Sequence, residues 1–418
     1  MHIECSRKYL SLATEADIIR SMDAIEETLS RAVDKIYPSR EALVKVLRSG
    51  KKIKLYQGFD PSGIQLHIGH LTGLMKLRQF QKLGHQVIFL VGDGTGQAGD
   101  PSGKSRTRDK FLNREELREN ARDYVLQASK IIDFEGENKA EILYNGDWLN
   151  RLSLPELLEI AGHFTLQQLE ERDMYIERKN QGIPINFREF LYPLLQGYDS
   201  VAMEVDLEIG GTDQTFNMLC GRQLVKDYLK KEKFVLTTPL LTDASGKKIG
   251  KTEGNVIALT SIPEDLYGLI MNLPDTAIIN SFYYITDLPL KEVKQMEDSL
   301  DAGDNPMKYK KQLAFRLTRM LNSEKEALAA QAYFEAVFQK RSESADIPEF
   351  KIDRDNIPLT ELLLTLNMVK SKGEAKRLIR EGAVDVDRTR IKDEKYSVAV
   401  TDGRVIRTGK HKFVRLRK

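Results

Sequence analysis

The chain has 418 residues, enough for two or three domains, and 41% of them are apolar and 30% charged. This balance is typical of globular proteins. No run of 18 apolar residues occurs, which excludes a membrane-spanning helix, and two cysteines are too few for a disulfide framework or a Cys-rich zinc site. No secretory signal is visible near the first residue, so we expect a cytoplasmic protein.

The net charge of +2 is spread unevenly along the chain. Residues 357–418 carry 16 Lys/Arg against 8 Asp/Glu, a net charge of +8, so the rest of the chain carries −6. A basic segment attached to an acidic body predicts an appendage that binds a polyanion such as RNA.

The first half of the chain alternates between helix-like and strand-like patterns. Residues 14–36 place apolar residues three or four positions apart, which predicts an amphipathic helix packed outside the main core. Residues 54–59 are predicted as a strand that ends in a turn, residues 70–83 as a helix and residues 86–92 as a buried strand. This order implies a right-handed crossover and a parallel sheet, whose ligands bind beyond the carboxyl ends of the strands.

The second half has a different organisation. Residues 262–340 are mostly helical in pattern, and the polar segment 341–348 is typical of a linker. A helical pair is expected over residues 359–382, and short strands with basic residues between them over 384–417. We expect an amino-terminal helical extension, an α/β domain, a helical domain, a linker and a small α+β domain, with bounds 1–40, 41–260, 261–340, 341–356 and 357–418.

The segment from Gly58 to His70 is the most informative, because a strand and a turn lead to a helix that begins near His67 and His70. A helix N-terminus carries unpaired N–H groups and a partial positive charge, which favour phosphate. Two imidazoles there would hydrogen-bond a phosphoryl group, and Gly69 would let a base or ribose approach the backbone. An isolated His-x-x-His, however, is more often a pair of capping or core residues.

Residues 242–252 form a second candidate site, with three lysines in the five positions 247–251 and glycines at 246 and 250. Such a flexible cationic loop suits a polyphosphate, although a solvated surface turn is the commoner explanation of this pattern alone. Neither this segment nor Gly103-Lys104-Ser105 has the glycine spacing of a P-loop.

Together, the two segments resemble the signatures of class I aminoacyl-tRNA synthetases. His67-Ile68-Gly69-His70 is the HIGH signature, and Lys248-Ile249-Gly250-Lys251-Thr252 resembles the KMSKS loop but departs at three of its five letters. Over roughly residues 50–290 the chain is similar to bacterial tyrosyl-tRNA synthetases, and its C-terminal segment resembles an S4 RNA-binding domain. The resemblance implies a Rossmann-like, doubly wound parallel-sheet catalytic domain, a helical domain facing the anticodon stem, and a small α+β S4-like domain.

The resemblance also implies the residues of a tyrosine site. Asp199 would accept a hydrogen bond from the substrate phenol, and Tyr192, Gln196 and Asp100 would hold the α-ammonium. Tyr56 matches the family residue that contacts the phenol. Independently of the family, the spacing of 192, 196 and 199 puts these side chains on one helical face.

The ATP site and the catalytic groups are implied in the same way. Asp213 would hold the ribose hydroxyls, and Lys104 and Arg108 match basic residues near the pyrophosphate or the tRNA end. The ATP-binding residues are expected to be Gly58, Asp60, Ser62, His67, Gly69, His70, Gly211, Asp213, Gln214, Lys248 and Lys251. The catalytic groups among and beside them are expected to be His67, His70, Lys248, Lys251 and Thr252. The chain departs from the family at Glu208, where Gln is usual, and at Thr215-Phe216, where Trp-Gly is usual.

The C-terminal segment carries a cluster of basic residues on and around one predicted helix: Lys370, Lys372, Lys376, Arg377 and Arg380. A compact basic face recognises structured RNA mainly through its phosphates and shape. The partners implied are tRNA(Tyr), L-tyrosine, ATP with Mg²⁺ carried on it, and a second copy of the chain in a homodimer. No protein-bound metal, membrane or DNA partner is expected.

The reaction implied has two steps, tyrosyl-adenylate formation and transfer of tyrosine to the 3′ end of tRNA, catalysed by positioning and charge stabilisation. Three alternatives remain open from the sequence. A tryptophanyl-tRNA synthetase shares the fold, a small-molecule nucleotidyltransferase shares the His-x-x-His, and a non-catalytic RNA-binding protein could use a synthetase scaffold.

Overall fold

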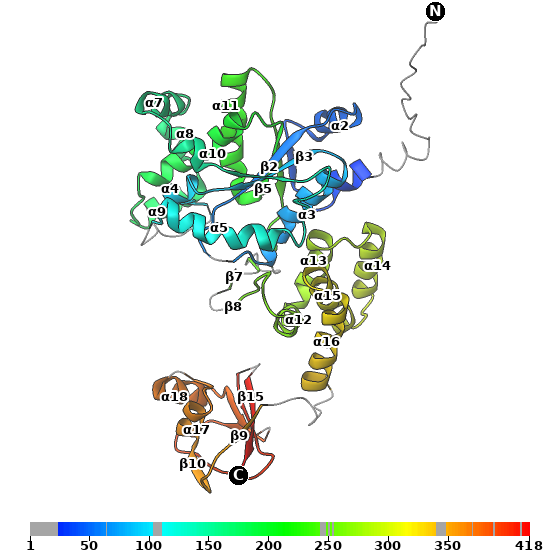
Figure 1. The fold of residues 1–418 in the computed structure, drawn as a ribbon, viewed down its shortest axis with the longest axis vertical. Helices are drawn as coiled ribbons and strands as arrows, with labels where there is room; N and C mark the ends of the chain where they lie inside the picture. Colours follow the sequence, from blue (N-terminus) through cyan, green and yellow to red (C-terminus); the bar gives the residue numbers. More distant parts are fainter. Residues whose placement is uncertain are drawn as a thin grey trace, which may run out of the picture. The chain divides into compact units, whose positions relative to one another are not determined.

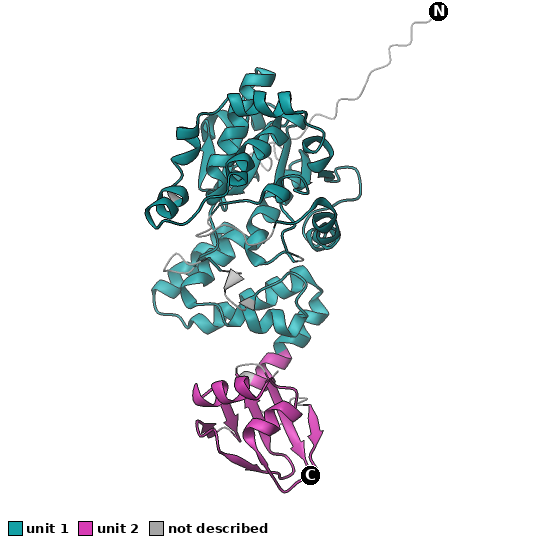
Figure 2. Ribbon diagram, turned by 90° about the vertical axis from the view of Figure 1, so that its left-hand side faces the viewer, with its two compact units in different colours: residues 1–331 teal, residues 332–418 magenta. Residues whose placement is uncertain are grey.

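The computed structural model describes residues 24–63, 65–102, 111–242, 248–249, 251–252, 255–339, 348–369, 371–387, 389–409 and 412–418. The chain divides into two compact units, residues 1–331 and residues 332–418, coloured separately in Figure 2.

The first unit is built on a six-stranded sheet with the order β1-β6-β5-β2-β3-β4. Its strands are β1 (Lys35–Tyr37), β2 (Lys54–Phe59), β3 (Gln86–Val91), β4 (Glu141–Tyr144), β5 (Leu207–Gly211) and β6 (Phe234–Thr238). All neighbours are parallel except β1, which runs antiparallel to β6 at the edge. The order of the parallel strands reverses between β2 and β5, so the crevice at their carboxyl ends is the expected ligand site.

Helices cover this sheet, as Figure 1 shows. α3 packs on β2, β3 and β5, whereas α11 packs on β5 and β6 and against α10. The helices of this part are α2 (Arg40–Arg48), α3 (Ile68–Lys82), α4 (Thr95–Ala98), α5 (Arg114–Ala128), α6 (Gly146–Leu149), α7 (Leu154–Gly162), α8 (Leu166–Glu170), α9 (Asp173–Asn180), α10 (Arg188–Ala202), the 3₁₀ turn η1 (Thr212–Gln214) and α11 (Thr215–Leu229). The predicted parallel α/β architecture is confirmed.

The predicted strand–helix–strand unit matches β2, α3 and β3 closely. β2 covers the predicted residues 54–59, and α3 begins two residues before the predicted helix because His67 supplies its N-cap. Five of the six residues of β3 are buried, as expected for a central parallel strand covered on both faces.

The helix predicted over residues 14–36 is wrong at its C-terminal end. Residues 24–30 are helical, but Ala32 has a φ of +50° and Lys35–Tyr37 forms the edge strand β1, with Lys35 opposite Thr237. Pairing with β6 overrides the helical pattern there. Ile25 and Leu29 are buried, so this helix contributes to the core and does not pack outside it; residues 14–23 lie outside the described residues.

Two buried cations attach this amino-terminal segment to the rest of the unit. Arg31 donates to the main-chain carbonyls of Tyr283 and Thr286, and Lys76 of α3 donates to the carbonyl of Thr28 at 2.6 Å. Carbonyl groups at helix C-termini lack intrahelical donors, so these side chains supply hydrogen bonds that the helices cannot make for themselves.

The remainder of the first unit is helical beyond the short hairpin of β7 (Lys251–Thr252) and β8 (Asn255–Val256). It contains α12 (Pro263–Met271), η2 (Asp275–Ala277), α13 (Ile278–Ile285), α14 (Leu290–Asp301) and α15 (Pro306–Leu321). α16 (Glu324–Phe334) crosses the boundary between the two units, and the π-helical turn η3 (Glu335–Gln339) follows it in the second unit. These elements agree with the helical pattern of residues 262–340. None of the helices in the described ranges has the length and apolarity needed to cross a bilayer.

The second unit has its own sheet and core. Its five-stranded sheet has the order β12-β11-β14-β15-β9, and β10 pairs with β13 separately. The elements are β9 (Glu349–Lys351), β10 (Asn356–Pro358), α17 (Leu359–Thr365), α18 (Lys372–Arg380), β11 (Val384–Val386), β12 (Thr389–Ile391), β13 (Ser397–Ala399), β14 (Val405–Thr408) and β15 (Lys412–Arg417). Buried side chains of both helices and of the strands form one core, and the predicted helical pair and short strands match this small α+β fold.

One difference concerns the segment 341–356, which was expected to be a linker. Its residues Glu349–Lys351 form β9, which pairs in parallel with β15, so this part of the segment belongs to the C-terminal unit. Three residues carry too little pattern to predict a strand whose partner lies more than sixty positions away. Residues 340–347 are outside the described residues.

His85 links the end of α3 to the sheet through a buried turn. Its Nδ1 lies 3.5 Å from the main-chain nitrogen of Ile53, and its ring packs 5.9 Å from that of Phe80. Burial, with a smaller contribution from Lys52, lowers the pKa of His85 from 6.5 to about 4. Between these two values the unfolded chain binds a proton that the folded chain does not, so stability is lost as the pH falls from 6.5 towards 4.

The variant His85→Asn keeps an acceptor near Ile53 but cannot take up that proton. We therefore expect its free energy of unfolding to fall less than that of the wild type as the pH is lowered. The difference between the two proteins in the change of unfolding free energy from pH 7 to pH 4.5 should be on the order of 1–2 kcal/mol. Urea unfolding at a series of pH values measures it, and parallel pH profiles for the two proteins would contradict the assignment.

Candidate active site

A cavity of about 360 Å³ opens at the carboxyl ends of β2 and β5, where the strand order reverses. It brings together residues that are up to 190 positions apart in the sequence. The predicted site residues that line it are Tyr56, Gly58, Asp60, Ser62, His67, Gly69, His70, Asp100, Tyr192, Gln196, Asp199, Gly211, Asp213, Gln214 and Lys248. Lys104 and Arg108 lie outside the described residues, as do the side chains of Lys251 and Thr252.

The two histidines cap α3 and line the cavity at the same time. Nδ1 of His67 accepts a hydrogen bond from the main-chain N–H of Gly69 at 3.2 Å, and Nδ1 of His70 accepts from that of His67 at 3.0 Å. Their rings are 4.0 Å apart between centroids. Because Nδ1 is the acceptor in each ring, the neutral tautomer carries its proton on Nε2, and Nε2–H is the donor that each ring retains.

The predicted lysine loop lies against this helix start. The carbonyl oxygen of Ile249 is 3.4 Å from the position that a Cβ on Gly69 would take, and Ile68 donates to the carbonyl of Ile257 at 3.0 Å. Glycine at position 69 relieves crowding, because a Cβ would also lie 3.0 Å from the His67 ring. Two segments nearly two hundred positions apart thus border one cavity.

Lys248 is held by an acidic residue on the opposite wall. Its Nζ lies 2.8 Å from Oδ2 of Asp213, in an ion pair that is partly exposed on both sides. Asp213 belongs to η1, directly after β5. Two of the residues expected to bind ATP, the cation Lys248 and the carboxylate expected near the ribose, are therefore in contact with each other.

The closed end of the cavity contains a buried carboxylate, Asp199, which is 1% exposed. It accepts hydrogen bonds from Asn145 Nδ2 at 2.9 Å and from Trp148 Nε1 at 2.8 Å. Burial raises the pKa of Asp199 well above its usual value, while these two donors oppose the shift. Tyr56 is buried close by, and burial together with the charges of Glu208 and Asp199 raises its pKa as well.

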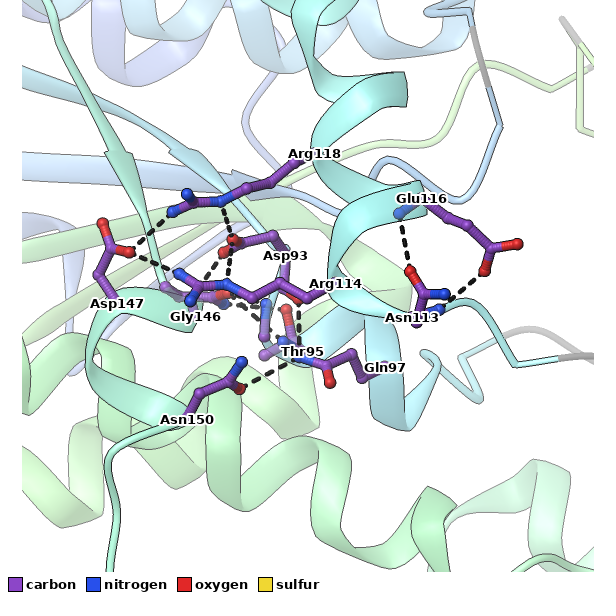
Figure 3. Close-up of polar contacts among 12 residues, drawn as sticks. Asp93, Thr95, Gln97, Asn113, Arg114, Glu116, Arg118, Gly146, Asp147 and Asn150 are labelled. Carbon is purple, nitrogen blue, oxygen red and sulfur yellow. Dashed lines mark hydrogen bonds and ion pairs between the residues drawn. The ribbon is translucent and has the colours of Figure 1, made fainter.

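A polar network holds the loop that carries Asn145 and Trp148 (Figure 3). The buried carboxylate of Asp93 accepts from Nε of Arg114 at 2.9 Å, from Nε of Arg118 at 2.7 Å and from the main-chain N–H of Gly146 at 2.7 Å. Both arginines also contact the exposed Asp147. The network ties the start of α5 to the loops that follow β3 and β4, and so fixes the donors of Asp199.

The residues expected around the α-ammonium and those expected around ATP do not form separate groups. Tyr192 donates to Asp60 at 3.0 Å, and Gln214 donates to Asp100 at 2.9 Å, so each pair joins one residue from each predicted set. Gln196 donates through Nε2 to Glu208 at 3.0 Å. Its Oε1 is buried, and no donor among the described residues reaches it, which leaves an acceptor suited to an ammonium group.

The chain matches two known families in succession. The family described as tRNA synthetases class I (W and Y) matches residues 48–339, and the Tyrosine–tRNA ligase SYY-like C-terminal domain matches residues 339–416. The tyrosine–tRNA ligase of Thermotoga maritima is 40% identical over 391 residues, which is 93% of this chain and 96% of that protein. The one from Desulfotalea psychrophila is 42% identical over 385 residues, 90% and 94% of the two chains. This chain belongs to the class I tyrosyl-tRNA synthetases.

Solved structures of the family share the fold. A C-terminally truncated mitochondrial tyrosyl-tRNA synthetase of Aspergillus nidulans superposes with a TM-score of 0.65 at 22% identity, covering 78% of this chain and all of that chain. The enzyme of Archaeoglobus fulgidus, complexed with L-tyrosine, gives 0.58 at 21% identity and covers 75% of this chain and 99% of that chain. The resemblance inferred from the two signature motifs is confirmed.

The departures from the family pattern have local explanations. Phe216 lies 5.1 Å from the guanidinium of the buried Arg172, and Thr215 donates to the carbonyl of Thr212 at 2.6 Å. These residues replace the usual Trp-Gly with a cation–π contact and a turn bond. Glu208 is buried and forms an ion pair with the equally buried Lys233.

Sequence reasoning missed several residues of this synthetase site. Asn145 and Trp148 follow β4, and their place at the carboxyl end of a parallel strand was a usable signal. Thr95 joins Asn145 to Asp60 through its hydroxyl. Lys233 gave no signal, because a single lysine before a strand is normally a surface residue.

The predicted RNA-binding residues lie on α18 of the second unit. Lys372, Lys376, Arg377 and Arg380 are exposed there, while Ala375 and Ile379 face the core. Arg377 forms an ion pair with Glu381, and Arg380 forms one with Glu394. Lys370 is outside the described residues.

Proposed function

We propose that the cavity beyond β2 and β5 is where this tyrosine–tRNA ligase activates tyrosine with ATP before passing it to tRNA(Tyr). The observation that carries the proposal is the buried carboxylate of Asp199, held by Asn145 and Trp148 beside Tyr56 at the closed end. A buried carboxyl oxygen in a dry pocket favours a ligand that brings a hydroxyl donor. The phenol of tyrosine supplies one.

The α-ammonium of tyrosine would be held at the other end of the cavity, by Gln196, Tyr192 and Asp100. The buried Oε1 of Gln196 supports this, because an ammonium group supplies the donor that this oxygen lacks among the described residues. Tyrosine would then lie with its carboxylate towards His67 and His70, at the start of α3.

In the first step a carboxylate oxygen of tyrosine attacks the α-phosphorus of ATP, and the bond to the pyrophosphate oxygen breaks. We infer that Nε2–H of both histidines donates to the phosphates as charge develops on them. The ribose hydroxyls would take the place of Lys248 on Asp213, which frees that lysine, with Lys251, for the departing pyrophosphate. Mg²⁺ enters with ATP as part of the substrate.

In the second step a ribose hydroxyl at the 3′ end of tRNA attacks the carbonyl carbon of the adenylate. The new ester bond forms as the bond to the phosphate breaks, and AMP leaves. Neither step needs a protein nucleophile, so the rate depends on positioning and on charge stabilisation.

Tyrosine is favoured over the other candidate functions by the relatives, which are named tyrosine–tRNA ligases along more than nine-tenths of this chain. A tryptophanyl-tRNA synthetase, a small-molecule nucleotidyltransferase and a non-catalytic RNA-binding protein are not favoured. ATP and tRNA are both cytoplasmic substrates, and we place the enzyme there.

We also propose a division of labour along the chain: residues 41–260 activate the amino acid, residues 261–340 face the anticodon stem, and residues 357–418 bind RNA as an S4-like domain. The exposed positions 372, 376 and 380 repeat every four residues along α18 and so form one cationic stripe. Such a stripe suits the phosphates of a structured RNA.

A homodimer is the third part of the proposal. α7 exposes Leu154 and Leu158 by 68% and 62%, Leu166 of α8 is 54% exposed, and Phe187 before α10 is 70% exposed. α7 and α8 lie next to each other in Figure 1. Large apolar side chains gathered on neighbouring elements mark an association surface, and a second copy of the chain would cover them.

We expect Asp199→Ala to lower kcat/KM for tyrosine in ATP–pyrophosphate exchange by roughly 10²-fold, because the substrate hydroxyl loses its hydrogen-bond partner in a buried site. The tyrosine-to-phenylalanine ratio should fall with it. Asp123→Ala, which removes an exposed carboxylate of α5 outside the network around Asp93, is the matched control and should change neither. Wild-type selectivity in Asp199→Ala would show that the phenol end is misassigned, and exchange with tryptophan alone would refute the proposed function.

For the C-terminal unit, we expect Lys372→Ala/Lys376→Ala to weaken tRNA binding, because up to two phosphate contacts are lost. The slope of log K against the logarithm of the salt concentration should become less negative by roughly one to two. Exchange measured without tRNA should not change. Lys351→Ala, on β9 of the same unit, is the control. An equal loss of exchange and of charging would contradict the division of labour.

For the homodimer, we expect Leu154→Asp/Leu158→Asp to halve the mass measured by light scattering at micromolar concentration, because two charges would be buried in the interface without partners. Leu126→Asp changes a leucine of α5 that is 69% exposed and should leave the dimer intact. A wild-type protein that is monomeric over the whole concentration range would refute the proposal.

A further inference from the structure

Beneath the tyrosine end of the cavity lies a cluster of polar groups that the proposed reaction does not use. Lys233, directly before β6, is fully buried, and Glu208 of β5 is 1% exposed. They form a close ion pair. The Lys233 ammonium also donates to Ser200 Oγ at 2.7 Å and to the carbonyl of Met218 at 3.3 Å, so its three hydrogens have three acceptors.

The backbone is shaped to hold this cluster. A Cβ on Gly221 of α11 would lie 2.6 Å from Nζ of Lys233, 2.9 Å from Oγ of Ser200 and 3.3 Å from Oε2 of Glu208. Only glycine leaves room for all three groups here. The ion pair is therefore an integral part of the packing between α10, α11 and β5.

The proton of Ser200 can be placed from these contacts. Ser200 Oγ accepts from Lys233, and its own hydrogen points to Oε2 of Glu208 at 3.3 Å. The hydroxyl of Tyr56, 2.9 Å from the same oxygen, must then be the donor of the bond between them. The ion pair thus fixes the direction in which the hydroxyl of Tyr56, a residue that lines the cavity, donates its hydrogen bond.

The second oxygen of Glu208 fixes an amide. A carboxylate only accepts hydrogen bonds, so the group of Gln196 that lies 3.0 Å from Oε1 of Glu208 is the amide nitrogen. The amide oxygen must then point the other way. This is the buried Oε1 of a residue that lines the cavity, and no donor among the described residues reaches it.

We propose that Glu208, neutralised by Lys233, is a positioning residue that turns the amide oxygen of Gln196 towards the α-ammonium of tyrosine. The inference rests on the proposed function and adds to it the residue that sets the polarity of the ammonium site. Without an acceptor at position 208 the amide would be free to flip, and its NH₂ group would then meet the ammonium, which can only donate.

The test compares Glu208→Met/Lys233→Met with the wild type. Replacing both members of a buried ion pair by apolar residues of similar size is often neutral for stability, so the variant is expected to fold. KM for tyrosine in ATP–pyrophosphate exchange should rise about tenfold, while KM for ATP stays within about twofold.

Two inhibitors locate the effect. Tyramine keeps the ammonium and lacks the carboxylate, whereas 3-(4-hydroxyphenyl)propionate keeps the carboxylate and lacks the ammonium. The inhibition constant of tyramine should rise with KM for tyrosine, and that of the propionate should not change. A general distortion of the pocket would weaken both inhibitors equally, and that result would overturn the proposal.

Glu208→Gln/Lys233→Met is the conservative variant. Its new amide oxygen can accept from Gln196, so it should bring KM for tyrosine back to within about threefold of the wild type. This variant also tests the proposal if Glu208→Met/Lys233→Met does not fold. A tenfold rise in its KM for tyrosine would count against the proposal. Exchange by the wild type with no dependence on tyrosine would refute the proposed function itself, whereas normal wild-type exchange with unchanged variants would refute only the role of Glu208.

Discussion

The structure of this site depends on the cost of burying carboxylates. Three of them, Asp93, Asp199 and Glu208, lie in the dry interior around one end of the cavity, and each is stabilised in a different way. Asp93 is paired with two arginines, Asp199 accepts from neutral N–H donors, and Glu208 is neutralised by a lysine. Of these three, Asp199 accepts hydrogen bonds from neutral donors, and it is the one proposed to receive a substrate hydroxyl.

These stabilising groups also connect the two ends of the cavity. Asp199 is bonded to Asn145, Asn145 to the hydroxyl of Thr95, and Thr95 to Asp60, which in turn accepts from Tyr192. Every link is a side-chain hydrogen bond of 3.0 Å or less. One continuous chain of bonds therefore joins Asp199 to Tyr192, the residues proposed to bind the phenol and the α-ammonium of tyrosine.

The sequence predicted the parts of the site that depend on local pattern. β2, the start of α3 and the spacing of 192, 196 and 199 all follow from periodicity or from a short motif. The strand at Lys35–Tyr37 was missed because its partner lies about two hundred residues away in β6. Lys233 was missed for a related reason: only the folded sheet brings it to Glu208, and nothing near it in the sequence marks it as buried.

The histidine motif fits two interpretations of one pattern. His67 and His70 cap α3 through Nδ1, as the structural interpretation expects, and the same bonds place the proton of each neutral ring on Nε2, on which the proposed chemistry depends. The proton directions at Ser200, Tyr56 and Gln196 follow the same logic, because each is fixed by a neighbour that can only donate or only accept. Such directions depend on three-dimensional contacts and cannot be predicted from residue types alone.

The three-residue strand β1 has a consequence for how the molecule meets other chains. It covers the outer side of β6 with an antiparallel partner, and its own outer side presents only a few unpaired backbone groups. A long open strand would be a template for adding further strands and for aggregation. Because β1 is only three residues long, this edge of the sheet offers another strand few backbone groups to pair with. A contact made here through side chains can be specific in a way that backbone pairing is not.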